Sequence, residues 1–502
     1  MHQPESKNEE METVIKVKDP DDTVLSQPQN ESTVNKETNT YKRNDISSNK
    51  LSKKVFRSQE SMFIELMEIG HVETVYNLFI AMFILYLSYN ILDDYFVKGR
   101  ITLASETFHK GFKNIYYAFV MWLILQLYTF GIYYPLKLWA NIRNKLQHHE
   151  YLQLAWSAFW LLTYIISIGL FFYITAKVCL VYDIRYASSL ALLLDATRLL
   201  MKQHAFVRVS CARVLSSGKT FAETIENVEK PNGKQTLDNN GDYLGIPPFR
   251  KYLYYLFAPT LLYRDNYPRT THIRWKFVAL RFMECLAFVF LFAIVFENQL
   301  RPILIDFGEK KITPELIVRT YFAILPPVVL MLLSFVFFLL HSWNNLTAEL
   351  LKFADRRFHG DWWTSTNYFQ FFRRWNTVVG DWLYEYIFRD FYMHINPSKA
   401  AATFALYIVS AIVHEYIISI SLRLLFPVMT FLYIVGGMIL VHVTTWIPKN
   451  IGNLNFCLCF LIGVTLSFGS YPIEYYAKEN CPKEQYTSWS DLLIPHMWAC
   501  RN

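Results

Sequence analysis

A histidine and a glutamate lie next to each other in the middle of an apolar stretch, at His414 and Glu415 within residues 400–425. About 20 apolar residues suffice to cross a bilayer as a helix, so this stretch is long enough to span one. An ionisable side chain inside a span is costly and usually faces a cavity or a partner, which makes it a candidate for function. A histidine ordinarily titrates near neutral pH, so His414 could act as a general base on a substrate hydroxyl. The alternative is a packed histidine that is hydrogen-bonded to a neighbouring helix. Glu415 points about 100° away around the helix, so we expect it to pair structurally within the bundle.

A block rich in aromatic and basic residues precedes this stretch and ends in Arg373-Arg374-Trp375-Asn376. The amide of Asn376 could donate a hydrogen bond to an acyl carbonyl as negative charge builds on its oxygen. The alternative is a cap or turn residue. Arg373, Arg374 and Lys399 could meet the phosphates of a cytosolic ligand. They could equally be long side chains that reach from an apolar surface to the membrane interface.

The elements that must position these residues are transmembrane helices. The 502-residue chain is 53% hydrophobic and only 18% charged, whereas about a quarter of a soluble domain is charged. Apolar runs of suitable length cover residues 76–92, 115–139, 155–178, 187–200, 273–295, 316–341, 400–425, 427–446 and 454–468. We therefore predict a polytopic helical membrane protein with about nine membrane segments. The fourth run is short enough to be tilted, re-entrant or partly buried in protein.

The distribution of charge predicts which parts face the cytosol. Residues 1–60 are polar, and we expect them to be a disordered cytosolic tail. Basic residues before the first span and in the long loops 201–272 and 342–399 place those segments in the cytosol. An odd number of spans then puts the tail, residues 473–502, in the lumen. Cys481 and Cys500 of that tail would be expected to join in an oxidising compartment, and the alternative is two free thiols.

Several classes of site have no signature in the chain. The net charge is +7, but no nucleic-acid motif is present, and the basic loops fit a membrane surface or a phosphorylated ligand. No glycine-rich nucleotide loop, paired-cysteine metal motif or serine elbow stands out. These observations alone do not separate an enzyme from a proton-coupled transporter.

The motifs quoted above resemble those of the membrane-bound O-acyltransferase superfamily. The run Phe358-His359-Gly360-Asp361-Trp362-Trp363-Thr364 is similar to the family signature Phe-Tyr-x-Asp-Trp-Trp-Asn. Arg373-Arg374-Trp375-Asn376 falls where the family carries its catalytic asparagine, and Val413-His414-Glu415-Tyr416 where it carries its catalytic histidine. Residues 257–269, 381–384 and 475–501 resemble the sterol O-acyltransferase branch, whose lumenal tail is disulfide-linked.

Three positions depart from the family pattern. His359 stands where the signature has tyrosine, and Thr364 stands where it has asparagine. Gly380 replaces a histidine that both the sterol and the diacylglycerol enzymes usually carry. These changes bear on acceptor and acyl-chain preference more than on the fold.

The resemblance implies an all-α fold of about nine transmembrane helices, residues 61–472, around an intramembrane reaction chamber in the endoplasmic reticulum. It implies transfer of a fatty acyl group from acyl-CoA to a sterol 3-hydroxyl, with His414 as the base and Asn376 holding the acyl carbonyl. The acyl-CoA would bind along Arg373, Arg374, Trp375, Lys399 and Ser410. CoA is a substrate here, so no metal or bound cofactor is implied, and a homodimer or homotetramer is expected. The rivals are another lipid alcohol as acceptor, or a relative that binds or transports lipids without catalysis.

Overall fold

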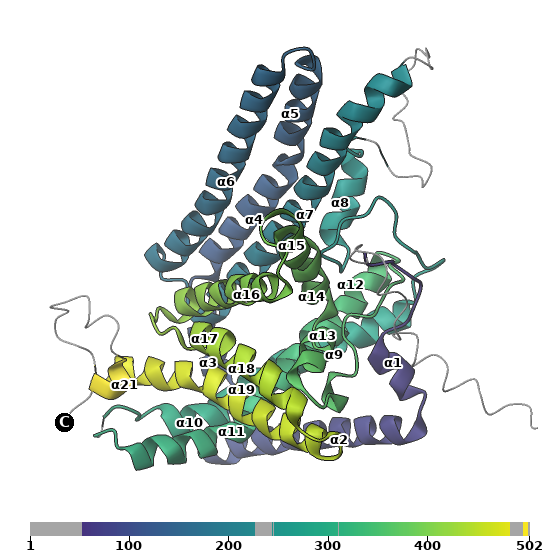
Figure 1. The fold of residues 1–502 in the computed structure, drawn as a ribbon. Helices are drawn as coiled ribbons and strands as arrows, with labels where there is room; N and C mark the ends of the chain where they lie inside the picture. Colours follow the sequence, from purple (N-terminus) through teal and green to yellow (C-terminus); the bar gives the residue numbers. More distant parts are fainter. Residues whose placement is uncertain (1–52, 226–242, 244, 310, 482–494, 500–502) are drawn as a thin grey trace, which may run out of the picture. The chain divides into compact units, whose positions relative to one another are not determined.

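Helices make up the secondary structure of the chain. A computed structural model describes residues 53–225, 243, 245–309, 311–481 and 495–499, and in these residues there is no strand beyond two isolated bridges. Most of the predicted N-terminal tail, and Cys500, lie outside the described residues. Figure 1 shows the order of the helices along the chain.

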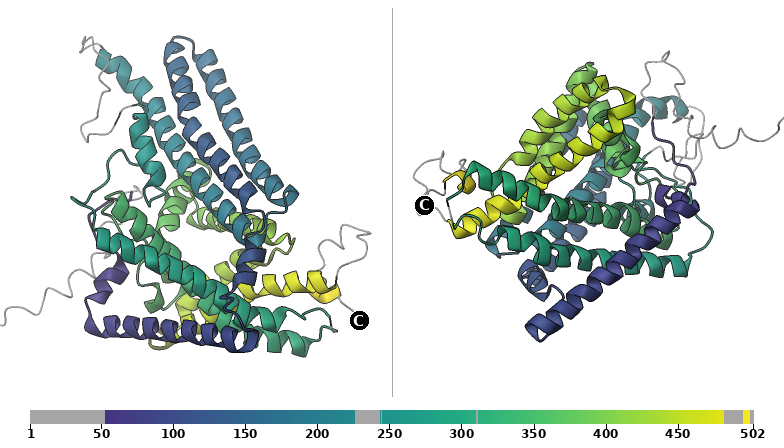
Figure 2. Two further views of the ribbon diagram at one scale, coloured as in Figure 1. Left: turned by 180° about the vertical axis from the view of Figure 1, so that it is seen from behind. Right: turned by 90° about the horizontal axis from the view of Figure 1, so that it is seen from below.

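Eight helical segments of the described residues are long and apolar enough to cross a membrane. They are α2 (Gly70–Lys98), α4–α5 (Ile115–Lys145), α6 (Glu150–Val181), α9–α10 (Trp275–Leu304), α11–α12 (Pro314–Leu350), α16 (Lys399–Leu422), α17–η6 (Val428–Trp446) and α19 (Lys449–Asn480). The chain is therefore a multi-pass helical membrane protein. Figure 2 shows α2 at the edge of the bundle, where most of its apolar side chains are exposed.

The predicted fourth run, 187–200, is the start of a much longer helix, α7 (Tyr186–Ile225). Three of its side chains, Leu193, Ala196 and Leu199, are completely buried. This face packs against α4 (Ile115–Gly131) and α16. The run is thus partly buried in protein, which was one of the three expectations for it, and the helix continues well into the predicted cytosolic loop.

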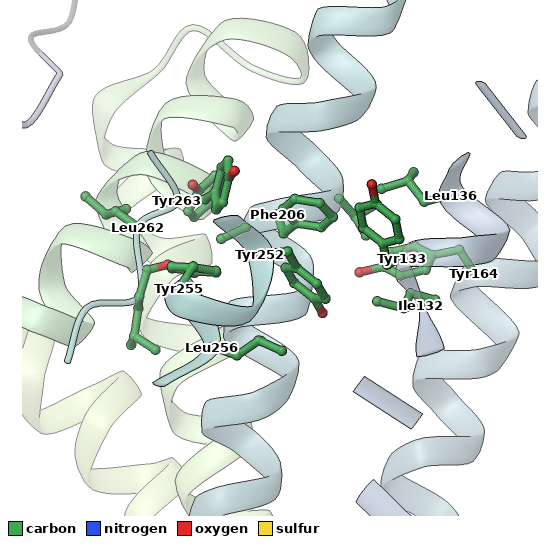
Figure 3. Close-up of a cluster of buried hydrophobic side chains, with 14 of the residues drawn as sticks. Ile132, Tyr133, Leu136, Tyr164, Phe206, Tyr252, Tyr255, Leu256, Leu262 and Tyr263 are labelled. Atoms are coloured by element: carbon green, nitrogen blue, oxygen red, sulfur yellow. The ribbon is translucent and has the colours of Figure 1, made fainter. Parts of the chain in front are cut away.

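A cluster of tyrosines joins α5 (Tyr133–Lys145), α7 and α8 (Phe249–Phe257), as Figure 3 shows. The ring of Phe206 lies 4.1 Å from that of Tyr252, and Tyr255 lies edge-on to Tyr263 at 5.1 Å. The hydroxyl of a buried tyrosine usually finds a hydrogen-bond partner, and two of the tyrosines here do so. Tyr252 donates to the carbonyl of Thr129 (2.8 Å) and Tyr255 to that of Leu261 (2.6 Å). The cluster therefore accommodates polar hydroxyls within an apolar core.

Short elements connect the spans beside the aromatic block. They are η3 (Trp362–Thr364), α13 (Tyr368–Arg374), α14 (Thr377–Leu383), η4 (Tyr384–Phe388) and α15 (Arg389–His394). Polar side chains fix where three helices of this region begin: Asn367 caps α13, Asn376 caps α14 and Ser398 caps α16. Each accepts a hydrogen bond from a backbone N–H of the first turn, which would otherwise lack a partner.

An extended segment, residues 54–61, precedes α1 (Met62–Met67) and lies along the loop that follows α12 (Asn344–Leu350). We call it the strap. The backbone N–H of Gln59 donates to the carbonyl of Ala354 (2.9 Å), and Arg356 donates back to the carbonyl of Gln59 (3.0 Å). The packed part of the chain therefore begins before the predicted boundary at residue 60.

Candidate active site

One ring nitrogen of His414 is hydrogen-bonded within its own helix, and the other is available to a substrate. Its Nδ1 lies 2.7 Å from the carbonyl oxygen of Ser410, one turn earlier on α16. Because a carbonyl can only accept, Nδ1 carries the hydrogen and Nε2 carries the lone pair. The ring of Tyr433, in η5 (Leu432–Gly437), packs against the imidazole at 5.0 Å. This arrangement presents Nε2 as a proton acceptor.

The neighbouring Glu415 joins three helices. Its carboxylate accepts hydrogen bonds from the hydroxyl of Tyr471 on α19 (3.1 Å) and from the backbone N–H of Thr430 on α17 (3.1 Å). Ser419 of its own helix donates a third (3.0 Å). The structure thus confirms the expectation that Glu415 pairs structurally within the bundle.

Asn376 is the N-cap of α14, so the structure shows the role that the sequence raised as the alternative. Its Oδ1 accepts a hydrogen bond from the N–H of Val379 at 3.1 Å. Only the oxygen of the amide can accept this bond, which fixes the side-chain orientation. The cap does not use the two N–H groups of Nδ2. The cap and the predicted donor are therefore compatible in one side chain.

The aromatic block anchors this region on α19. The ring of Trp362 lies 4.7 Å from that of Trp375 and 5.5 Å from that of Phe460 on α19. The N–H of Gly360 donates to the carbonyl of Arg374 (2.8 Å), and a Cβ at Gly360 would come within 3.3 Å of the Arg374 side chain. Glycine is thus suited to the close approach that ties the signature to α13.

A ring contact joins the two parts of the candidate site. Phe372 of α13 lies 5.7 Å from Tyr407 of α16, centroid to centroid. Asn376 follows Phe372 by one turn of chain, and His414 follows Tyr407 by about two turns, or about 10 Å. The helix that ends just before Asn376 therefore touches the helix that carries His414, although the described hydrogen bonds of the two candidate residues go to other groups.

The residues predicted to bind acyl-CoA fall into two sets. Arg374 is engaged with the block, since its Nη1 lies 3.4 Å from the Asp361 carboxylate and donates to Thr364 (3.1 Å). Trp375 belongs to the aromatic cluster. The other three are Arg373, which is exposed, Lys399, which is exposed at the start of α16, and Ser410, which lies one turn before His414. About 22 Å of helix separates Lys399 from His414.

An apolar groove of about 320 Å³ lies beside η5, the element that carries Tyr433. Its lining includes Phe431 and Leu432, Leu466 of α19 and Trp498 of α21 (His496–Ala499). Leu432 lines the groove, and the next residue is Tyr433, whose ring packs against His414. The groove and the imidazole therefore contact neighbouring residues of η5. The sequence gives no direct signal for this groove, because its walls come from separate spans.

A second buried polar cluster lies inside the spans and was missed by the sequence analysis. Glu284 of α9 (Trp275–Val295) pairs with Arg281 at 2.9 Å. It also accepts hydrogen bonds from Tyr76 and Ser342, each at 2.8 Å. Arg281 in turn contacts the imidazole of His341. The signal that singled out His414, an ionisable residue within an apolar run, applies equally to these side chains.

Comparisons with known proteins agree with these motifs. The membrane-bound O-acyltransferase family matches residues 194–471, which contain both Asn376 and His414. The chain is 34% identical over 452 residues to Sterol O-acyltransferase 1 of Mus musculus, covering 89% of this chain and 79% of that protein. It is 30% identical over 451 residues to Sterol O-acyltransferase 2 of Homo sapiens, covering 89% and 80%.

Proposed function

The chain belongs to the membrane-bound O-acyltransferase family, and on that premise we propose that it transfers a long-chain acyl group from acyl-CoA to a sterol 3-hydroxyl. The observation that carries the proposal is the state of His414, whose Nδ1 is held by Ser410 so that Nε2 can accept a proton. The names of the relatives support a sterol as the acceptor.

In the proposed reaction, Nε2 of His414 takes the proton of the acceptor hydroxyl. The acceptor oxygen attacks the carbonyl carbon of the thioester, and Nδ2 of Asn376 donates to the carbonyl oxygen as negative charge builds on it. The new C–O bond forms and the C–S bond breaks. The CoA sulfur leaves as a thiolate and receives the proton from His414. No acyl-enzyme forms, and the transfer requires no metal or bound cofactor.

The two substrates would approach from different sides, the acceptor from the bilayer and acyl-CoA from the cytosol. The apolar groove beside η5 supports lateral entry of a hydrophobic acceptor from the bilayer. Acyl-CoA would come from the cytosol, with Lys399, Arg373 and Arg374 meeting its phosphates and Ser410 near the thioester. The low water content of a site inside the membrane limits hydrolysis of the thioester.

We also propose a cellular membrane, a topology and an oligomeric state for the enzyme. We place it in the endoplasmic reticulum with a cytosolic N-terminus and a lumenal C-terminus. A Cys481–Cys500 disulfide would then form in the lumen. We expect a homodimer or homotetramer.

Microsomes that contain the chain test the reaction directly. They are given labelled oleoyl-CoA together with cholesterol, diacylglycerol or a fatty alcohol. We expect the label in steryl ester. Label in a different ester would keep the mechanism and change the acceptor, and absence of any ester would refute the proposed activity.

A further inference from the structure

The strap lies on the loop that leads to the aromatic block. Besides the backbone bonds of Gln59, the side chain of Gln59 donates to the carboxylate of Asp355 at 2.7 Å. The other oxygen of that carboxylate accepts the backbone N–H of Arg57 at 3.2 Å. The aromatic ring of Phe56 packs edge-on against Tyr267, with ring centroids 5.2 Å apart. Polar and apolar contacts thus hold the strap along its length.

The loop under the strap is bonded to the residue that follows Asn376. The hydroxyl of Thr377 donates to the carbonyl of Arg357 (2.6 Å), and its backbone N–H donates to the carbonyl of Phe358 (3.1 Å). Thr377 is the first residue of α14, the helix that Asn376 caps. A displacement of the loop would therefore displace the start of α14.

The strap also contacts α14 directly, about one turn farther along the helix than Thr377. The ammonium of Lys54 lies 2.7 Å from the carboxylate of Asp381, and both side chains are partly buried. Asp381 follows Asn376 by five residues on the short helix α14. The strap is therefore connected to α14 in two ways: indirectly through the loop that bonds to Thr377, and directly through the Lys54–Asp381 ion pair.

We propose that the strap positions Asn376 for catalysis and that Lys54 is a positioning residue for the acyltransfer. The inference rests on the proposed function, because Asn376 must hold the acyl carbonyl for its position to matter. A donor of this kind contributes about 10²–10³ to kcat, and a misplacement of about 1 Å can cost about 10²-fold. Loss of the Lys54–Asp381 contact should thus lower kcat about 10- to 100-fold and leave the KM for acyl-CoA within about twofold.

The chain offers a matched control, because Lys53 is adjacent to Lys54 and exposed. We expect Lys54→Met to lower kcat, Lys53→Met to have no effect and Lys54→Arg to restore most of the activity. In an Asn376→Ala background, Lys54→Met should cause no further loss, since the group that it positions is gone. A full additional loss in that background, or an equal loss in Lys53→Met, would overturn the proposal.

A second measurement does not depend on turnover. Hydrogen exchange of the full-length protein in nanodiscs should show faster exchange over residues 353–377 in Lys54→Met than in Lys53→Met. Equal exchange in the two variants would refute the positioning role even if the wild type forms an ester. Faster exchange in a protein that forms no ester would support the strap contact and reject the proposed reaction instead.

Discussion

Replacing His414 tests the central element of the proposed mechanism. In His414→Ala no group remains at the position of Nε2 to take the proton of the acceptor hydroxyl. General-base catalysis by a positioned side chain contributes about 10²–10⁴-fold, which is about 2.7–5.4 kcal/mol of transition-state free energy. We therefore expect kcat to fall by about that factor. His414→Phe should lose as much, although it keeps a ring against Tyr433 and so preserves the packing.

His442 provides the matched control. It lies in α18 (Met438–Val443), and its Nδ1 lies 2.8 Å from the carbonyl of Met438 one turn earlier, as His414 relates to Ser410. His442 is exposed, however. Ester formation from labelled acyl-CoA should therefore change less than about twofold in His442→Ala. Activity within tenfold of the wild type in folded His414→Phe, or equal losses in the two alanine variants, would refute the assignment of the base.

Three further changes separate stability from catalysis. Asn376→Asp keeps an acceptor for the N–H of Val379 but has no N–H donors, so it should fold normally and lose about 10²–10³ in kcat. Asn376→Ala loses the cap as well, so it should also lose about 1 kcal/mol of stability. Thermal unfolding and turnover distinguish the two variants. Glu349→Gln removes the negative charge that lies 2.6 Å from the buried guanidinium of Arg356, so it should cost about 3–5 kcal/mol, and an unchanged melting temperature would contradict this. Burial lowers the pKa of His359, so below pH about 6.5 the folded state binds fewer protons than the unfolded chain. The protein should therefore keep its full stability above pH about 6.5 and lose stability as the pH falls below it. His359→Phe should flatten this pH dependence of the melting temperature.

The sequence predicted most of the helices, because apolar runs are local patterns, and local patterns also singled out the candidate residues. An ionisable residue in an apolar run identified His414, and the helical period separated Glu415 from it. The dual use of Asn376 could not be chosen from the sequence, since a cap and a donor are both properties of an asparagine before a helix. The strap could not be predicted either, because its contacts join residues about 300 positions apart and depend on how the spans pack.

The contact between the strap and α14 also constrains the parity of the membrane crossings. Non-helical backbone is not exposed to the hydrocarbon of a bilayer. The strap and the loop that it contacts must therefore lie on the same side of the bilayer, with an even number of crossings between them. Five of the eight candidate spans lie between the strap and residue 353, which is odd. We infer that α7 makes the remaining crossing, because it runs alongside the candidate span α16. Asp183, just before the start of α7, pairs with Arg423 at the end of α16 (2.8 Å), and farther along α7 Arg208 pairs with Asp390, before the start of α16 (2.8 Å). The short apolar run 187–200, predicted from the sequence as the fourth membrane segment, would then be the start of a span whose charged side chains pair with residues that flank α16.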